Sequence, residues 1–506
     1  MKQMKWITIL LVMALLLVAC GGAAAPEAEE PAEEPAAAEE EAMEEEEMEE
    51  EEMEEEMEEE PTAVPEEEAM DEGEKVQVRW FVGLGTGSNE DQIPIQEEVV
   101  AEFNESQDKI ELVVEFVDNA SATDALNTQI AGGNSPDIIG PVGVAGRAAF
   151  TDALLDLQPL IDANGYDLGD FDPAMVDFYN LESRGQVGLP FGIFPSFIFF
   201  NKDLFDEAGL PYPPQEFGQP YVDADGNEKP WNVDTVRELG MLLTVDGNGN
   251  DATSPDFDAE NIVQFGFGYQ WADIRGRATM WGAGSFADAD GNAVIPDHWR
   301  ESMHWYHDAM WADSFYPNGV YGGSEILGGG NWFESGNMAM DHVHLWYATC
   351  CTAGLDAEWD LAVMPAAPDG SITAKMHADT FAILEGSENP DAAFEVLSYL
   401  IGPAADKLTK LYGGLPARLS LQGAYFDTIG DTVEHLNGRD INWDVVIQSM
   451  AYPDNPNHEE GMPNELQARD ILAEFDQLMS NDPDFDVDAG LDDMQQKLQE
   501  VFDQAN

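Results

Sequence analysis

The spacing of apolar and polar residues predicts alternating strands and helices after residue 75. Residues 76–82 and 110–117 have the pattern of strands, and a glycine-rich turn leads to a third short strand at 137–139. Two helices lie between these strands, with apolar faces made of Ile95, Val99, Val100 and Phe103 in the first and of Ala122, Ala125, Leu126 and Ile130 in the second. This order predicts an α/β fold in which helices cover both faces of a parallel sheet.

The loops that follow the first and third strands are candidate ligand contacts. In parallel α/β sheets, ligands bind beyond the carboxyl ends of the strands, where we expect Thr86, Ser88 and Pro141 to lie. The glycines from Gly83 to Gly87 lack the final glycine of a dinucleotide-binding fingerprint. Loop amides and hydroxyls would instead bond ligand hydroxyls, and a plain turn is the alternative.

An apolar run lies at the N-terminus. Lys2 and Lys5 precede residues 7–18, which are fewer than the roughly 20 apolar residues that a membrane span needs. The pattern is that of a signal peptide. Its end, Leu-Val-Ala-Cys20-Gly, resembles the lipobox of bacterial lipoproteins, which implies cleavage after residue 19 and a lipid on Cys20. The protein would then be extracytoplasmic, attached to the outer face of the cell membrane or held in the periplasm.

Residues 20–74 predict a disordered, acidic tether. From Glu27 to Glu74 the chain has 28 acidic residues and no basic one, so like-charge repulsion extends it and no core can form. An acidic tail that recruits cations or a basic partner is the alternative.

The remaining 432 residues are enough for two domains. They contain 74 of the 102 acidic residues and 18 of the 20 basic ones. This charge excludes nucleic acids and anionic membrane surfaces as partners, because their binding needs basic patches. Contact with the membrane is expected through the lipid only.

Several short segments identify a family. In chain order they are Ala101–Asn104 (AEFN), Ile130–Ile139 (IAGGNSPDII), Gly188–Gly192 (GLPFG), Phe200–Gly209 (FNKDLFDEAG), Phe333–Met340 (FESGNMAM), Ala362–Pro365 (AVMP) and Asp391–Phe394 (DAAF). Together they resemble the characteristic blocks of family 1 extracellular sugar-binding proteins, relatives of maltodextrin-binding protein. Each block alone is weak, but the series covers most of residues 75–417.

The resemblance implies a two-lobe, periplasmic-binding-protein-like fold that closes about a hinge. A monomer would capture a mono- or oligosaccharide and deliver it to the permease subunits of an ABC importer, which is driven by a cytoplasmic ATPase. Chain crossings are expected near Phe191, near Asp379 and within 437–456. The expected lobes are residues 75–192 with 379–440, and 193–378 with 455–506.

Two functions from other classes stay open. One is a secreted glycoside hydrolase, although the sequence lacks the Gly-x-Ser-x-Gly, His-Glu-x-x-His and phosphate-loop motifs, and paired carboxylates are uninformative in so acidic a chain. The other is a surface protein that holds polysaccharide without transporting it. We expect a binding protein and no enzyme.

A sugar site needs flat apolar surfaces for pyranose rings and hydrogen-bonding groups for hydroxyls. Among the 12 tryptophans, most of which should fill core, the resemblance points to Trp271, Trp281 and Trp346. Further candidates lie beside them or in loops: Tyr269, Gln270, Arg275, Asp379 and Arg418. Arg418 has the alternative of capping a helix or pairing with a carboxylate.

Two groups of residues could bind metal. Asp246, Asn248, Asn250, Asp256 and Asp258 partly match a calcium loop, with a turn-rich loop as the alternative; no other cofactor is expected. Histidines could form a zinc cluster, although no cysteine would join them as a ligand. The candidates are His298, His304, His307, His342 and His344.

Cys350 and Cys351 are the cysteines that remain after Cys20. In an oxidising compartment they can form a disulfide between neighbours that stiffens a loop of the site, and a free pair is the alternative.

Overall fold

The computed structural model describes residues 75–181, 184–459 and 461–504. They belong to one compact unit, Asp71–Asn506. Cys20 and the acidic segment therefore lie outside the described residues. Within the described part of the chain, no helix is both long enough and apolar enough to cross a membrane.

The first part of the unit has the predicted β-α-β-α-β order. Strands β1 (Val76–Val82), β2 (Ile110–Phe116) and β3 (Ile138–Val142) are parallel, with β1 between the other two. Helices α1 (Ile93–Ser106) and α2 (Asn119–Ala131) connect them. The predicted α/β fold is confirmed; these three strands are parallel as expected, whereas later strands of the same sheet pair antiparallel.

Alternation along β1 places the two helices on opposite faces of this sheet. Neighbouring side chains of a strand point to opposite faces. Trp80 packs in one core cluster with Phe103 of α1, whereas Phe81 packs in another with Leu126 of α2. Both faces of the sheet are therefore covered.

Pro141, expected in a loop, is instead the fourth residue of β3. The strand extends to Val142 because β14 pairs with it there, Thr380 lying opposite Val142. That partner lies more than two hundred residues away in the chain, so local pattern could not show it.

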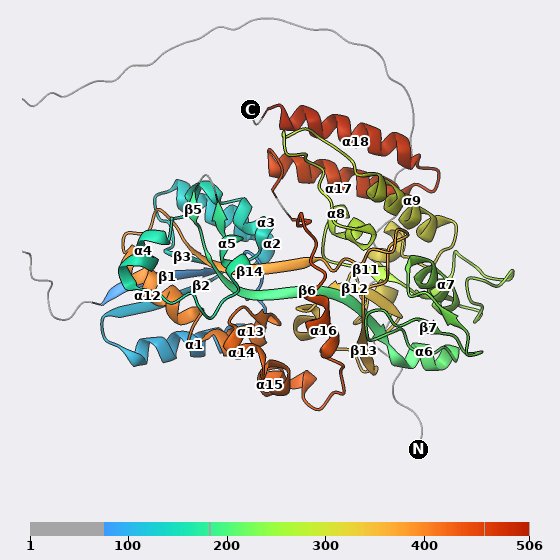
Figure 1. The fold of residues 1–506 in the computed structure, drawn as a ribbon, viewed down its shortest axis with the longest axis horizontal. Coiled ribbons are helices and arrows are strands. Elements are labelled where there is room, and N and C mark those ends of the chain that lie inside the picture. Colours follow the sequence, from blue (N-terminus) through green and yellow to red (C-terminus); the bar gives the residue numbers. More distant parts are fainter. Residues whose placement is uncertain (1–74, 182–183, 460, 505–506) are drawn as a thin grey trace, which may run out of the picture. The chain divides into compact units, whose positions relative to one another are not determined.

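Strands β6 (Leu189–Asn201) and β14 (Met376–Ile383) connect two groups of strands, as Figure 1 shows. The sheet has the order β11-β12-β6-β14-β3-β1-β2. Up to Pro195, β6 pairs with β14; from Ser196 it pairs with β12 and β13. The strands not yet bounded are β11 (Gly268–Tyr269), β12 (Met340–His344), β13 (Trp359–Ala362) and β15 (Leu415–Pro416).

The larger core cluster gathers around the second half of β6, and two smaller ones gather around the β1 sheet. The predicted lobe boundaries near 192 and 379 fall inside β6 and β14. The larger cluster includes Tyr425 and Ile429, although the expected first lobe contains both residues. The lobe boundaries remain predictions.

The other elements complete the unit. The helices are α3 (Val144–Ala148), α4 (Gln158–Asn164), α5 (Pro173–Asp177), α6 (Lys202–Ala208), α7 (Val233–Leu243), α8 (Ile274–Ala278), α9 (Asp297–Trp311), α10 (Gly319–Gly322), α11 (Tyr347–Cys350), α12 (Pro390–Leu400), α13 (Ala405–Tyr412), α14 (Leu419–Gln422), α15 (Tyr425–Thr432), α16 (Asp444–Ser449), α17 (Glu465–Asn481) and α18 (Val487–Phe502). Short strand pairs are β4 (Asn180–Leu181) with β5 (Gly185–Gln186), β7 (Tyr221–Val222) with β8 (Glu228–Lys229), and β9 (Val245–Asp246) with β10 (Ile262–Gln264).

Candidate ligand site

The glycine-rich loop lies beside the end of β3. A Cβ atom on Gly85 would come within 3.3 Å of the carbonyl oxygen of Pro141. Thr86 and Ser88 are half-buried in this loop. The Gln92 side-chain amide donates a hydrogen bond of 3.2 Å to the Thr86 hydroxyl, which fixes the hydroxyl's position. The structure thus brings together the loop residues that the sequence singles out.

Two carboxylates stand at the end of β3. A Cβ on Gly143 would lie 3.3 Å from Asp379 Oδ1 and 4.0 Å from Glu459 Oε2, so both carboxyl groups lie close to the backbone that follows β3. Burial, together with the neighbouring charge of Glu459, raises the pKa of Asp379 to about 7. Although burial opposes it, the nearby ring of His377 lowers the pKa of Glu459. Such oxygens can accept hydrogen bonds from ligand hydroxyls.

An aromatic pair forms a second surface. The rings of Trp271 and Trp346 meet edge to face, with centroids 5.9 Å apart and an interplanar angle of 86°. Trp271 is 51% exposed, and its backbone has φ 67°, a left-handed conformation that a bulky residue rarely adopts. Strained backbone of this kind concentrates at ligand sites.

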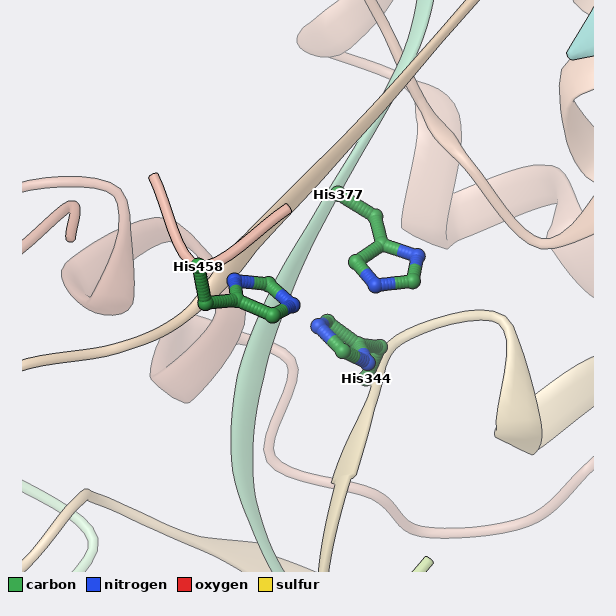
Figure 2. Close-up of side chains that lie close together, drawn as sticks. All are labelled: His344, His377 and His458. Atoms are coloured by element: carbon green, nitrogen blue, oxygen red, sulfur yellow. The ribbon is translucent and has the colours of Figure 1, made fainter. Parts of the chain in front are cut away.

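Histidines connect the aromatic pair to the carboxylates. The ring of His344 lies 6.1 Å from that of Trp346 and 3.8 Å from that of His377. His377 Nε2 is in turn 3.3 Å from Glu459 Oε1. With His458, these residues form one contiguous site around β14, and Figure 2 shows the three imidazoles turned toward one another.

A hollow of about 390 Å³ adjoins Trp271 on the side of α17, and Tyr269 and Gln270 line it as well. The Gln270 amide donates to the Gly330 carbonyl at 2.6 Å and accepts from the Trp332 backbone N–H at 2.9 Å. Gln270 therefore holds the wall of the hollow, while the aromatic rings supply its apolar surface.

Two other predicted residues are buried in packing. Trp281 is 3% exposed and meets the ring of Trp305 at 5.1 Å. Arg275 is 2% exposed and forms ion pairs with Asp273 and Glu465, at 2.8 and 3.3 Å. The pair with Glu465 attaches α8 to α17.

Arg418 lies against the first group of strands, away from Arg275. Its guanidinium forms an ion pair with Asp170 at 3.4 Å and donates to the Tyr166 hydroxyl at 2.7 Å. It also lies over the ring of Phe171. Arg418 thus forms the carboxylate pair that the sequence leaves open as an alternative to ligand binding.

The residues of the partial calcium loop bond one another. Asp246 Oδ1 accepts from the backbone N–H groups of Asn248 and Asn250, at 2.8 and 2.9 Å, and Oδ2 accepts from that of Asp258 at 2.9 Å. The Asn250 amide also donates to the Asp256 carbonyl. Although burial opposes it, hydrogen bonds to Asp246 from the side-chain amide of Asn250 and from these backbone N–H groups lower the pKa of its carboxyl group. The geometry is that of a turn-rich loop, and calcium binding remains a prediction.

The histidines that the sequence suggests for a zinc cluster do not all come together in the structure. His298 contacts the Ala283 carbonyl and His304 an aspartate of α18, so neither joins His344. His377 and His458 take their place. His377 precedes Asp379 by two residues and so shares its strand face, a usable signal. Nothing in the local sequence marks His458.

A disulfide joins Cys350 and Cys351 at the end of α11. Trp346 is the residue that immediately precedes this helix. The bond therefore lies on the segment that carries one ring of the aromatic pair.

The chain matches one protein-family model and resembles several known proteins in sequence. The family model described as bacterial extracellular solute-binding protein matches residues 87–407. The sn-glycerol-3-phosphate-binding periplasmic protein of Brucella abortus is 29% identical over 143 residues, which are 27% of this chain and 32% of that protein. That of Rhizobium meliloti is 28% identical over 141 residues. The chain thus matches about a third of the length of these relatives.

Solved structures show the same fold. An ABC substrate-binding protein of Listeria monocytogenes in complex with cycloalternan has a TM-score of 0.64 at 18% identity, covering 85% of this chain and 100% of its own. A glycerophosphocholine complex from Mycobacterium tuberculosis has a TM-score of 0.63 at 14% identity, covering 85% and 99%. The predicted two-lobe fold is confirmed.

Proposed function

This chain belongs to the bacterial extracellular solute-binding proteins, and from this premise we propose that it captures a sugar between its two lobes and delivers it to an ABC importer. The family is one of binding proteins, and its match spans more than half of the chain. Family membership alone does not specify the ligand. The chemistry of the site supports a sugar.

The Trp271–Trp346 pair is the observation that carries the sugar proposal. A pyranose has apolar C–H faces and a rim of hydroxyls, so it needs an aromatic platform with hydrogen-bond acceptors beside it. Trp271 offers an exposed ring, and the histidines connect Trp346 to Glu459 and Asp379. Aromatic and acidic groups thus belong to one chain of contacts, with two histidine rings between them, and a polyhydroxylated ligand needs both kinds of group.

The charge of the site favours a neutral sugar over a phosphate ester. The curated relatives bear the name of glycerol 3-phosphate binders. Here Asp379 and Glu459 lie at the end of β3, where a phosphate would meet carboxylate oxygens at short range. The ionised carboxylate of Glu459 repels a phosphate in this partly buried site, whereas ligand hydroxyls can donate to the oxygens of both carboxyl groups.

Transport requires two further partners. We expect a monomer held at the membrane by lipid on Cys20, and the permease subunits of the importer as its docking partner. The lipobox residues support the anchor, and family membership supports the importer.

A thermal-shift screen tests the proposal. Mono- and oligosaccharides, with glycerol 3-phosphate as the comparison, are added to the protein without its signal peptide. A ligand that binds only the folded state stabilises it by about 2.7 kcal/mol at a hundred times its Kd. We expect at least one sugar to raise the melting temperature. Stabilisation by glycerol 3-phosphate alone would contradict the sugar proposal.

A further inference from the structure

Three histidines from separate segments converge beside the aromatic pair. His344 ends β12, His377 belongs to β14, and His458 lies between α16 and α17. One ring nitrogen from each lies within 4.8 Å of the other two. The ring centroids are 3.8 to 5.8 Å apart, and Figure 2 shows nitrogens facing a common space.

The converging nitrogens are buried and have no hydrogen-bond partner. His344 is fully buried and His458 is 1% exposed. Among the described residues, nothing hydrogen-bonds to His458 Nε2 or either ring nitrogen of His344, and His377 Nε2 has only Glu459 Oε1 nearby, at 3.3 Å. Buried polar atoms are almost always paired, so several unpaired imidazole nitrogens in one place call for a ligand.

A carboxylate orients one of the rings. His458 Nδ1 lies 2.7 Å from Asp454 Oδ2, and both side chains are buried. Asp454 is itself held by the backbone N–H groups of Met376 and His458, each donating at 2.8 Å. An aspartate behind a histidine fixes the tautomer that leaves Nε2 as the free acceptor, the usual arrangement behind a metal-binding imidazole.

The surroundings also supply negative charge. Glu459 Oε1 is 3.3 Å from His377 Nε2, close enough to become a fourth ligand. Asp379 lies next to Glu459, and a cation here would offset the repulsion between these two carboxylates. Imidazole nitrogens suit Zn²⁺ and its neighbours in the first transition series, whereas Ca²⁺ and Mg²⁺ prefer all-oxygen sites.

We propose that His344, His377 and His458 bind one divalent transition-metal ion of the Zn²⁺ type, with Glu459 as the fourth ligand. Zn–N bonds of about 2.0–2.1 Å in a tetrahedron hold the nitrogens about 3.3 Å apart, so the rings close in by up to about 1.5 Å. The ion joins β12, β14 and the segment between α16 and α17. The proposal rests on the geometry of the three histidines; with the ion bound, Glu459 is its ligand and Asp379 is the carboxyl group left for ligand hydroxyls.

Calorimetric titration with ZnCl₂ tests the site. The protein without its signal peptide is titrated in excess Mg²⁺, which occupies the many surface carboxylates without competing for imidazoles. The wild type should bind one tight Zn²⁺ per chain. His458→Ala and His377→Gln should weaken this binding at least about tenfold, and Asp454→Asn, which acts through His458, about 10- to 100-fold. His304→Ala is the matched control, because that half-exposed ring is paired with Asp488 instead, and it should leave the affinity unchanged.

Spectroscopy and stability separate coordination from misfolding. Co²⁺ in place of Zn²⁺ should give the intense visible absorption of a four-coordinate ion in the wild type and in His304→Ala, and lose it in His377→Gln. Melting curves without metal identify any variant that fails to fold; His377→Gln, whose side chain is 16% exposed, is the mildest of these changes. Tight binding that survives the histidine substitutions, or an absence of tight binding in the wild type, overturns the proposal.

Discussion

Three tryptophans near the site have different surroundings, and these determine what each can do. Trp271 is half-exposed and meets Trp346 edge to face. Trp346 is half-buried and continues toward His344. Trp281 is enclosed by Trp305 and other rings. The first two can exchange water for a sugar ring, whereas the third cannot leave its packing.

Removing either ring of the exposed pair should affect binding rather than folding. Trp346→Ala and Trp271→Ala should each weaken sugar binding at least about tenfold, which corresponds to about 1.4 kcal/mol. The core control, Trp281→Ala, should lower the free energy of unfolding by about 3–5 kcal/mol. Denaturant unfolding without ligand and calorimetric titration distinguish the two effects. A strongly destabilised Trp346→Ala protein that binds with unchanged affinity would return Trp346 to the core.

A buried carboxyl group predicts a pH dependence of stability. Asp341 is fully buried, and within the described residues its carboxylate oxygens have no hydrogen-bond partner. Burial raises its pKa well above the ordinary value of 3.8, against the opposing influence of Lys375. The folded state therefore keeps a proton that the unfolded chain loses. The stability contributed by this group is present below about pH 4 and is lost as the pH rises.

Asp341→Asn tests this dependence, because asparagine keeps the shape and cannot ionise. Between about pH 4 and pH 7, the free energy of unfolding of the wild type should fall relative to that of Asp341→Asn, by up to about 1.4 kcal/mol per pH unit. Urea unfolding at a series of pH values measures the difference. Parallel curves for the two proteins would show that Asp341 is ionised in the folded state.

At the scale of elements, local pattern predicts the first strands and helices well and the site poorly. β1 and α1 follow from periodicity because each buries a face against its chain neighbours. β6 is buried along its whole length, and its partners change at Pro195 through contacts with β12 and β14, which no local window contains. His344 and His458 are also far apart in the sequence and come together only in the folded structure. Residue type therefore suggests His344 as a candidate, but no local pattern indicates His458.

An ion pair between α8 and α17, beside the hollow near Trp271, should stabilise the folded state. Arg277 of α8 forms two contacts with Asp476 of α17, at 2.7 and 3.1 Å, and its guanidinium is almost fully buried. Asp476→Ala should lower the free energy of unfolding by about 3 kcal/mol, because it leaves a buried charge without its partner. Glu474→Ala on the same helix, which breaks the exposed pair with Lys497, should cost at most about 1 kcal/mol. Equal losses in chemical denaturation would contradict a structural role for the Arg277 pair.

At the scale of the whole molecule, the chain combines a solute-binding unit with an N-terminal segment outside the described residues. Composition alone indicates that this segment is acidic and that Cys20 precedes it. Family membership then gives an extracytoplasmic location. Attachment to the membrane through Cys20 remains a prediction.

The anchor has its own test. Cys20→Ser should block lipid attachment, so the expressed protein should keep its signal peptide or be released without detergent, and it should no longer incorporate labelled fatty acid. Cys350→Ser with Cys351→Ser is the control, which should stay lipidated. A Cys20→Ser protein that is processed normally and remains membrane-bound would refute the assignment.

Calorimetric titration with the best sugar from the screen, followed by chromatography of the recovered ligand, tests the central claim most directly. Capture by a binding protein predicts saturable binding of one sugar per chain, with a negative heat-capacity change from apolar burial and with the ligand recovered intact. A glycoside hydrolase would return shortened sugar, and a surface polysaccharide binder would fail to saturate at one small ligand per chain. Either of these results, or no binding of any sugar, would contradict the account.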